Sequence, residues 1–130
     1  MTIYYDSKTG NVERFIAKIS AITNWRCIKI TSSMSVFDYG HLVTYTTKIG
    51  SIPDSTSAFM NENREYILSV SSSGNMNWGD NFARAADKVS KEHHIPILIK
   101  FELSGLVRDV NNFIQKVKDH ANKKMDTPQQ

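Results

Sequence analysis

Short apolar runs alternate along the chain with segments in which apolar residues recur every three or four positions. The apolar runs predict five strands, at residues 3–5, 27–30, 41–45, 66–70 and 96–99. The helical spacing predicts helices over residues 12–22, 82–94 and 107–121. Strands that alternate with helices favour a parallel sheet with helices packed on both of its faces.

Five strands in this pattern fit a flavodoxin-like, doubly wound α/β sheet with the strand order 2-1-3-4-5. Only residues 31–40 separate the second and third predicted strands. A parallel crossover usually needs about a dozen residues or more and often contains a helix. We therefore expect a shortened second crossover, formed by a short helix or an irregular loop.

Length and composition place the chain among single-domain globular proteins. It has 130 residues, of which 40% are hydrophobic and 22% are charged. We expect residues 1–124 to form the domain and the polar residues 125–130 to form a frayed C-terminal tail. The single cysteine, Cys27, cannot form an internal disulfide, which is compatible with a reducing compartment.

Several partner classes are disfavoured by the same composition. No apolar run approaches the ~20 residues that span a bilayer, and the N-terminus does not resemble a signal peptide. We interpret the protein as cytoplasmic, without a membrane partner. The net charge is +3, but the basic residues are scattered and only Lys123 and Lys124 are adjacent. This distribution does not favour nucleic-acid binding.

Glycines gather in the loops that follow the first, third and fourth predicted strands. These are Gly10, Gly50, Gly74 and Gly79. Ligands of open parallel sheets bind at the carboxyl ends of the strands, and glycine permits positive φ and a close approach of the backbone to a ligand. We expect the functional site at this edge, although ordinary turn glycines are the alternative.

The first of these loops, residues 6–12, has the composition of a phosphate-binding loop. It joins a strand to a helix and contains Ser7, Lys8, Thr9, Gly10 and Asn11, followed by Val12. The free N–H groups and the dipole at a helix start suit a phosphate. The loop is neither a Walker A motif nor a G-x-G-x-x-G fingerprint, so a monophosphate is favoured. Simple capping of the helix by Thr9 or Asn11 is the alternative, and the two roles are compatible.

The other two loops carry hydroxyl, amide and aromatic side chains. The second spans residues 46–53, and the third spans residues 71–81. Trp78 lies between two glycines of the third loop, which is unusual for a polar loop. Two interpretations of Trp78 remain open: it stacks on a planar ligand, or it covers an edge of the core.

Catalytic and metal motifs are not evident, so we predict no catalytic residue and no metal ligand. Ser104-Gly105 lacks the G-x-S-x-G pattern of hydrolases. His93 and His94 are adjacent, so on a helix they point about 100° apart and form a poor metal pair. We expect both at a helix C-terminus, where the helix dipole favours a proton.

The loops resemble those of the NrdI family, the flavodoxin-like proteins that accompany class Ib ribonucleotide reductase. Residues 7–12 with Arg14 and Phe15 resemble the family's phosphate loop, and residues 43–47 with Gly50 and Pro53 resemble its second flavin loop. Residues 73–75, 78–82 and 86–87 are similar to its third loop, and residues 96–98 and 100–105 match a further family segment. The similarity spans residues 3–117. The chain departs from the family at Asp6, where a hydroxyl is common, and at Ile49, where an aromatic is common.

The resemblance implies FMN as the cofactor, with its phosphate held by residues 7–12 and its isoalloxazine between the second and third loops. The cofactor-binding residues expected from the loops and the resemblance are Ser7, Lys8, Thr9, Gly10, Asn11, Val12, Thr46, Thr47, Lys48, Ile49, Gly50, Ser73, Gly74, Asn75, Trp78 and Gly79. Within this set we expect Trp78 beside the ring and Ile49-Gly50 near its N5 edge.

The resemblance also implies partners. Family members act with the small subunit of class Ib ribonucleotide reductase, whose dimanganese site needs an oxidant to generate its tyrosyl radical. The flavin, reduced by an unidentified reductant, would react with dioxygen and supply superoxide or its protonated form. Such a protein is a redox activator rather than a conventional turnover enzyme, since the cofactor carries the chemistry.

Two other functions remain open. One is a general electron-shuttling flavodoxin, which the basic charge balance disfavours because such flavodoxins tend to be acidic. The other is a flavin-free binding module that retains the fold, since a fold alone does not fix a function. The absorbance spectrum of the purified protein separates the second alternative from both flavin-dependent functions.

Overall fold

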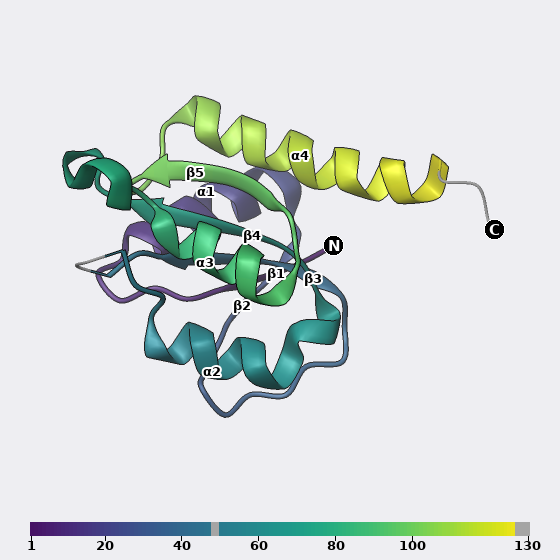
Figure 1. Ribbon diagram of the computed structural model, residues 1–130. Coiled ribbons are helices and arrows are strands. Elements are labelled where there is room, and N and C mark those ends of the chain that lie inside the picture. The colour runs from purple at the N-terminus through teal and green to yellow at the C-terminus, as the bar shows by residue number, and fades with distance from the viewer. Residues whose placement is uncertain (48–49, 127–130) are drawn as a thin grey trace.

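The computed structural model describes residues 1–47 and 50–126. Five parallel strands form one sheet with the order β2-β1-β3-β4-β5, which confirms the predicted flavodoxin-like topology (Figure 1). The strands are β1 (Thr2–Tyr5), β2 (Arg26–Lys29), β3 (Gly40–Tyr45), β4 (Ile67–Gly74) and β5 (Ile97–Glu102). This order places the carboxyl end of β1 beside that of β3.

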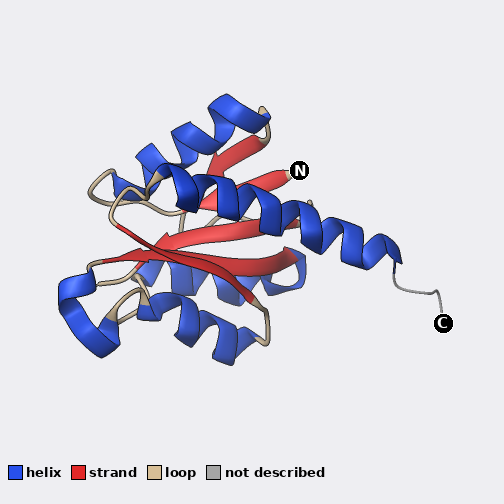
Figure 2. Cartoon of the chain, turned by 90° about the horizontal axis from the view of Figure 1, so that it is seen from above, coloured by secondary structure: helices blue, strands red, loops and turns tan. Residues whose placement is uncertain are grey.

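Helices cover both faces of the sheet (Figures 1 and 2). On one face, α1 (Asn11–Thr23) and α4 (Val107–Asp126) pack over a core that includes Phe15 and Phe113. On the other face, α2 (Asp54–Asn63) and α3 (Arg84–His93) pack over a second core that includes Phe59 and Val89. Neighbouring strand residues alternate between the two cores, because successive side chains of a strand point to opposite faces.

The hydrophobic pattern did not predict helix α2, and it predicted a β4 that was too short. The α2 segment has few apolar residues, and only Phe59, Met60 and two polar residues of it are buried. Strand β4 continues through Gly74, so Ser71 to Gly74 belong to the buried strand rather than to the third loop. The hydroxyl of Ser72 donates to the carbonyl of Ala83 at 2.6 Å, which shows how a serine-rich strand is accommodated in the interior.

The second crossover, residues 30–39, is an irregular loop without a helix, which is one of the two forms expected for the shortened spacing. The side chain of Asn63, at the end of α2, supplies hydrogen bonds that a helix would make internally. Its Oδ1 accepts from the N–H of Val36 at 2.8 Å, and its Nδ2 donates to the carbonyl of Met34 at 2.7 Å. The phenol of Tyr4 donates to the carbonyl of Asp38 at 2.7 Å. Interior side chains therefore hold this irregular loop against the sheet.

The last helix extends further than predicted. It ends at Asp126, two residues beyond the expected domain boundary at 124, and residues 127–130 lie outside the described part of the chain. Two short 3₁₀ helices, η1 (Arg64–Tyr66) and η2 (Met76–Asn81), flank β4. Among the described residues, no helix is both long enough and apolar enough to cross a membrane.

Candidate functional site

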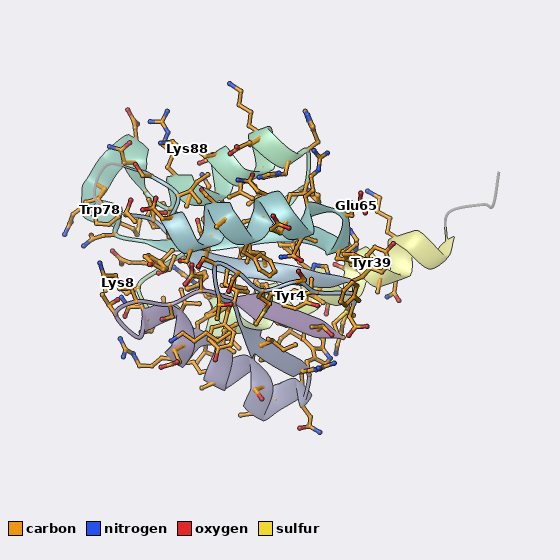
Figure 3. The ribbon with its side chains drawn as sticks, turned by 90° about the horizontal axis from the view of Figure 1, so that it is seen from below. Tyr4, Lys8, Tyr39, Glu65, Trp78 and Lys88 are labelled. Carbon is orange, nitrogen blue, oxygen red and sulfur yellow. The ribbon has the colours of Figure 1, made fainter. Side chains whose placement is uncertain are left out.

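A cavity of about 350 Å³ lies at the carboxyl edge of the sheet, where three loops meet. Lys8 and Trp78 lie toward this end of the molecule, opposite Tyr39 and Glu65 (Figure 3). The described residues that line the cavity are Ser7, Lys8, Thr9, Asn11, Val12, Tyr45, Thr46, Thr47, Ser73, Gly74, Asn75, Trp78 and Leu103. The three loops singled out in the sequence therefore do converge on one cavity.

Five members of the predicted set do not appear among these lining residues. Gly10, Gly50 and Gly79 belong to the same loops but do not line the cavity. Lys48 and Ile49 lie outside the described residues.

The first loop enters α1 through Gly10, which has a φ of +91° and occupies the N-cap position without a side-chain cap. A Cβ at this position would lie 2.8 Å from Nη1 of Arg14, which is the end of a flexible side chain, so the left-handed conformation rather than the space favours glycine. The hydroxyl of Ser7 accepts from the N–H of Glu13 at 3.3 Å. Capping of the helix by Thr9 or Asn11, the alternative interpretation of this loop, is therefore wrong.

Asp6, directly before this loop, is buried and serves helix α2. Its carboxylate accepts hydrogen bonds from the hydroxyls of Ser55 at 2.5 Å and Thr56 at 2.7 Å. The N-cap residue of α2 is Pro53, which makes no side-chain cap, so the carboxylate provides the negative charge that a helix start favours. Asp6 thereby joins the end of β1 to the start of α2 and does not line the cavity.

The hydroxyls of the second loop are engaged within the protein. The buried Thr46 accepts from the N–H of Ala85 at 3.2 Å through its Oγ1, and this contact ties the loop to the start of α3. Thr47 closes a turn, with its N–H donating to the carbonyl of Ser51 and its carbonyl accepting from the N–H of Gly50, both at 3.0 Å. Gly50 has a φ of +72°, which glycine adopts readily.

The third loop is held by β5 and by its own amides. Ser73 is buried and donates to the carbonyl of Leu103 at 2.6 Å, while the N–H of Leu103 donates to the carbonyl of Gly74 at 3.0 Å. Asn75 accepts from the N–H of Asn77 at 2.9 Å through its Oδ1. Trp78 is half-buried and forms part of the cavity wall, so it is available to a ligand on one side.

Tyr45 and Leu103 line the cavity but were not predicted. Leu103 follows β5, whereas ligand-binding residues were expected only in the loops after the first, third and fourth strands. Tyr45 ends β3 and also lines a neighbouring cavity of about 370 Å³. Burial, followed by the nearby carboxylates of Asp6 and Asp54, raises the pKa of the Tyr45 phenol. The phenol therefore remains a hydrogen-bond donor at neutral pH.

His93 behaves differently from the expectation of a favoured proton. α3 ends at His93, and His94 follows in the left-handed conformation, so their predicted place at a helix C-terminus is confirmed. Burial lowers the pKa of His93, and its Nδ1 has no hydrogen-bond partner among the described residues. Desolvation is the largest of the effects on this pKa and exceeds the opposing effect of the Glu92 carboxylate. No group of three or more His, Cys, Asp or Glu side chains that could hold a metal occurs within the described part of the chain.

The sheet order and the cavity at its carboxyl edge define a flavodoxin-like protein. A family model described as NrdI Flavodoxin like matches residues 3–115, which is most of the chain. The chain belongs to the NrdI family.

Curated relatives agree with this assignment. The chain is 46% identical over 115 residues to Protein NrdI of Bacillus licheniformis, which covers 88% of this chain and 86% of that protein. It is 41% identical over 127 residues to the SPbeta prophage-derived protein NrdI of Bacillus subtilis, covering 96% and 98% of the two chains. It is also 41% identical over 119 residues to Protein NrdI of Macrococcus caseolyticus, covering 92% and 90%.

Proposed function

We propose that the protein binds FMN in the 350 Å³ cavity and, when reduced, supplies an oxidant to a class Ib ribonucleotide reductase. The observation that carries this proposal is the convergence of the phosphate-type loop, the hydroxyl-rich loop and the Trp78 loop on one cavity. Membership of the NrdI family supports both the cofactor and the partner.

The donors at one end of the cavity fit a phosphate. Ser7 and Thr9 contribute hydroxyls, Asn11 contributes an amide, and Lys8 contributes a positive charge. The N–H groups of the first helical turn have no helical acceptor and suit an anion. No carboxylate is among the described residues that line the cavity, so nothing there opposes a phosphate dianion.

The remaining walls fit a flat aromatic ring system. Tyr45, Trp78 and Leu103 give the cavity aromatic and apolar surface, which suits stacking against an isoalloxazine. The turn closed by Thr47 and Gly50 shapes the second loop, whose residues Thr46 and Thr47 line the cavity. We therefore retain residues 7–12, 46–50, 73–75, 78 and 79 as the proposed cofactor-binding set.

The chemistry belongs to the cofactor, and the protein positions it. Bound FMN, once reduced by a separate reductant, would supply the one-electron reduction of dioxygen to superoxide, which would serve assembly of the dimanganese–tyrosyl radical centre in the small subunit. The residues around the cavity bind and orient the flavin and limit the access of water. The net charge of +3 favours an encounter with an acidic partner surface.

The decisive experiment mixes the reduced protein, dioxygen and the manganese-loaded small subunit from the same organism. Electron paramagnetic resonance then measures the tyrosyl radical, with free reduced FMN as the control. We expect radical well above the control. A yellow and reducible protein that gives no radical above the control would favour a general electron-shuttling flavodoxin. A protein that is colourless and does not bind added FMN would favour a flavin-free binding module.

A further inference from the structure

The side-chain amide of Asn11 is held by two residues from different parts of the fold. Its Oδ1 accepts from Nη2 of Arg14 at 2.6 Å and from the hydroxyl of Ser104 at 3.0 Å. Nε of Arg14 also donates to the Ser104 hydroxyl at 3.0 Å. The three side chains thus form a closed triangle between the first turn of α1 and the loop between β5 and α4.

The triangle fixes which way the Asn11 amide faces. A guanidinium only donates hydrogen bonds, so the amide atom beside Arg14 must be the oxygen. With Arg14 and Ser104 both donating to it, the two lone pairs of Oδ1 are filled. Among the described residues the Asn11 side chain makes only these two hydrogen bonds, so its Nδ2 keeps two N–H donors, and Asn11 is one of the residues that line the cavity.

The loop that carries Ser104 is anchored independently of Asn11. Nζ of Lys18, one turn further along α1, donates to the carbonyl of Ser104 at 3.3 Å and to the carbonyl of Gly105 at 3.1 Å. The hydroxyl of Ser104 is therefore presented from a backbone that is already held against α1. A fixed partner can orient a side chain in a way that a mobile surface serine cannot.

We propose that Arg14 and Ser104 are positioning residues for phosphate recognition, which keep the nitrogen of the Asn11 amide turned toward the ligand. This proposal rests on the proposed FMN function. Without the triangle, the amide could rotate and present its oxygen to the phosphate, where two acceptors would repel one another. The role of Arg14 is then geometric, and a positive charge alone does not replace it.

The test compares the affinities of FMN and riboflavin, which differ by the phosphate. Arg14→Lys keeps the charge but loses the planar fork, and Ser104→Ala removes one donor to Oδ1. We expect each variant to weaken FMN binding roughly tenfold and to leave riboflavin binding unchanged. Ser104→Thr, which restores a hydroxyl, should recover most of the loss. Arg26→Lys is the matched control, because Arg26 forms an exposed ion pair with Asp38 away from the cavity.

A double-mutant cycle with Asn11→Ala distinguishes two roles of Arg14 and Ser104. They orient the Asn11 amide, or they act on the phosphate directly. If Arg14 and Ser104 act through the amide, their substitutions should change FMN affinity little once the amide is absent. Undiminished effects in the Asn11→Ala background, or full FMN affinity of Arg14→Lys and Ser104→Ala, would overturn the proposal. If Ser104→Ala does not fold, the FMN affinities of Arg14→Lys and of its double mutant with Asn11→Ala still test the proposal.

The behaviour of the unmodified protein distinguishes the two levels of inference. Equal affinity for FMN and riboflavin would refute phosphate recognition in the cavity, and the proposed function with it. A clear preference for FMN that none of the triangle variants changes would leave the proposed function intact and overturn only the positioning role.

Discussion

The carboxylate of Asp6 accepts a hydrogen bond from the hydroxyl of Thr56 at 2.7 Å, across 50 positions of the sequence. Thr56 is fully buried, and its Oγ1 also lies 2.7 Å from Oγ1 of Thr44 on β3. The carboxylate that follows β1 is therefore linked directly to α2 and, through the Thr56 hydroxyl, to β3.

Removing that carboxylate should destabilise the fold. We expect Asp6→Ala to lower the free energy of unfolding by about 1–3 kcal/mol, because the hydroxyls of Ser55 and Thr56 lose a charged acceptor. Urea unfolding at neutral pH measures the change. Asp38→Ala is the control, since Asp38 forms only an exposed ion pair through its side chain and should cost less than about 1 kcal/mol. Equal losses of unfolding free energy in the two variants would show that the buried Asp6 network contributes no more stability than an exposed ion pair.

Hydroxyls of the predicted loops should separate into ligand-binding and structural ones. Thr9 is exposed and makes no side-chain hydrogen bond within the described part of the chain, whereas the buried Ser73 donates to the carbonyl of Leu103. Thr9→Ala should therefore weaken FMN binding by several-fold while the midpoint of unfolding stays constant. Ser73→Ala should instead lower stability by about 1 kcal/mol. Titration with FMN and urea unfolding on both variants check the pair, and the reverse pattern would contradict it.

Stability should fall on mild acidification because of His41. This side chain is buried on β3, with its Nδ1 2.6 Å from the hydroxyl of Ser69 and its ring against that of His120. Burial, together with the nearby His120 and the N-terminal amino group, lowers the pKa of His41 from 6.5 to about 4. The unfolded chain therefore binds the proton more readily, so the His41 contribution is complete above pH 6.5 and is lost as the pH falls toward 4.

Urea unfolding between pH 7 and pH 4.5 tests this expectation. His41 should contribute a slope of at most about 1.4 kcal/mol per pH unit within that window. His41→Asn should flatten the dependence, although it also costs stability at pH 7. His94→Asn is the matched control, because His94 is exposed and its left-handed conformation is one that asparagine tolerates. An unchanged slope in His41→Asn would assign the acid sensitivity to other groups.

Much of this fold was predictable because the apolar pattern of its strands is strong. In runs such as residues 41–45, alternate side chains enter the two cores on opposite faces of the sheet. The buried face of α1 follows from the helical spacing of its apolar residues Val12, Phe15, Ile16 and Ile19. Helix α2 escaped prediction because its buried side chains include Thr56 and Asn63, whose roles are hydrogen bonds rather than apolar packing. Polar residues with interior partners carry no periodic signal in a sequence.

The site was predictable to the level of its loops but not of its individual side chains. Loop position at the carboxyl edge follows from topology, so Ser7, Thr9 and Trp78 were found together. Hydroxyl chemistry alone could not distinguish Thr9 from Thr46, whose Oγ1 is committed to the start of α3. Leu103 was not predicted because its place at the cavity depends on a contact between distant segments. Its N–H donates to the carbonyl of Gly74.

Charge at the cavity edge should govern how fast the protein meets the reductase subunit proposed as its partner. Lys8 is exposed at the cavity, and Lys91 is exposed near the C-terminal end of α3, toward the opposite edge of the sheet. With FMN in excess, Lys8→Glu should slow association with the small subunit by a factor of about three to ten. Lys91→Glu changes the net charge equally but should have little effect, since charges are screened beyond ~10 Å at 0.1 M salt. Stopped-flow association measures both rates; equal slowing by the two variants would mean that net charge, rather than the cavity edge, steers the encounter.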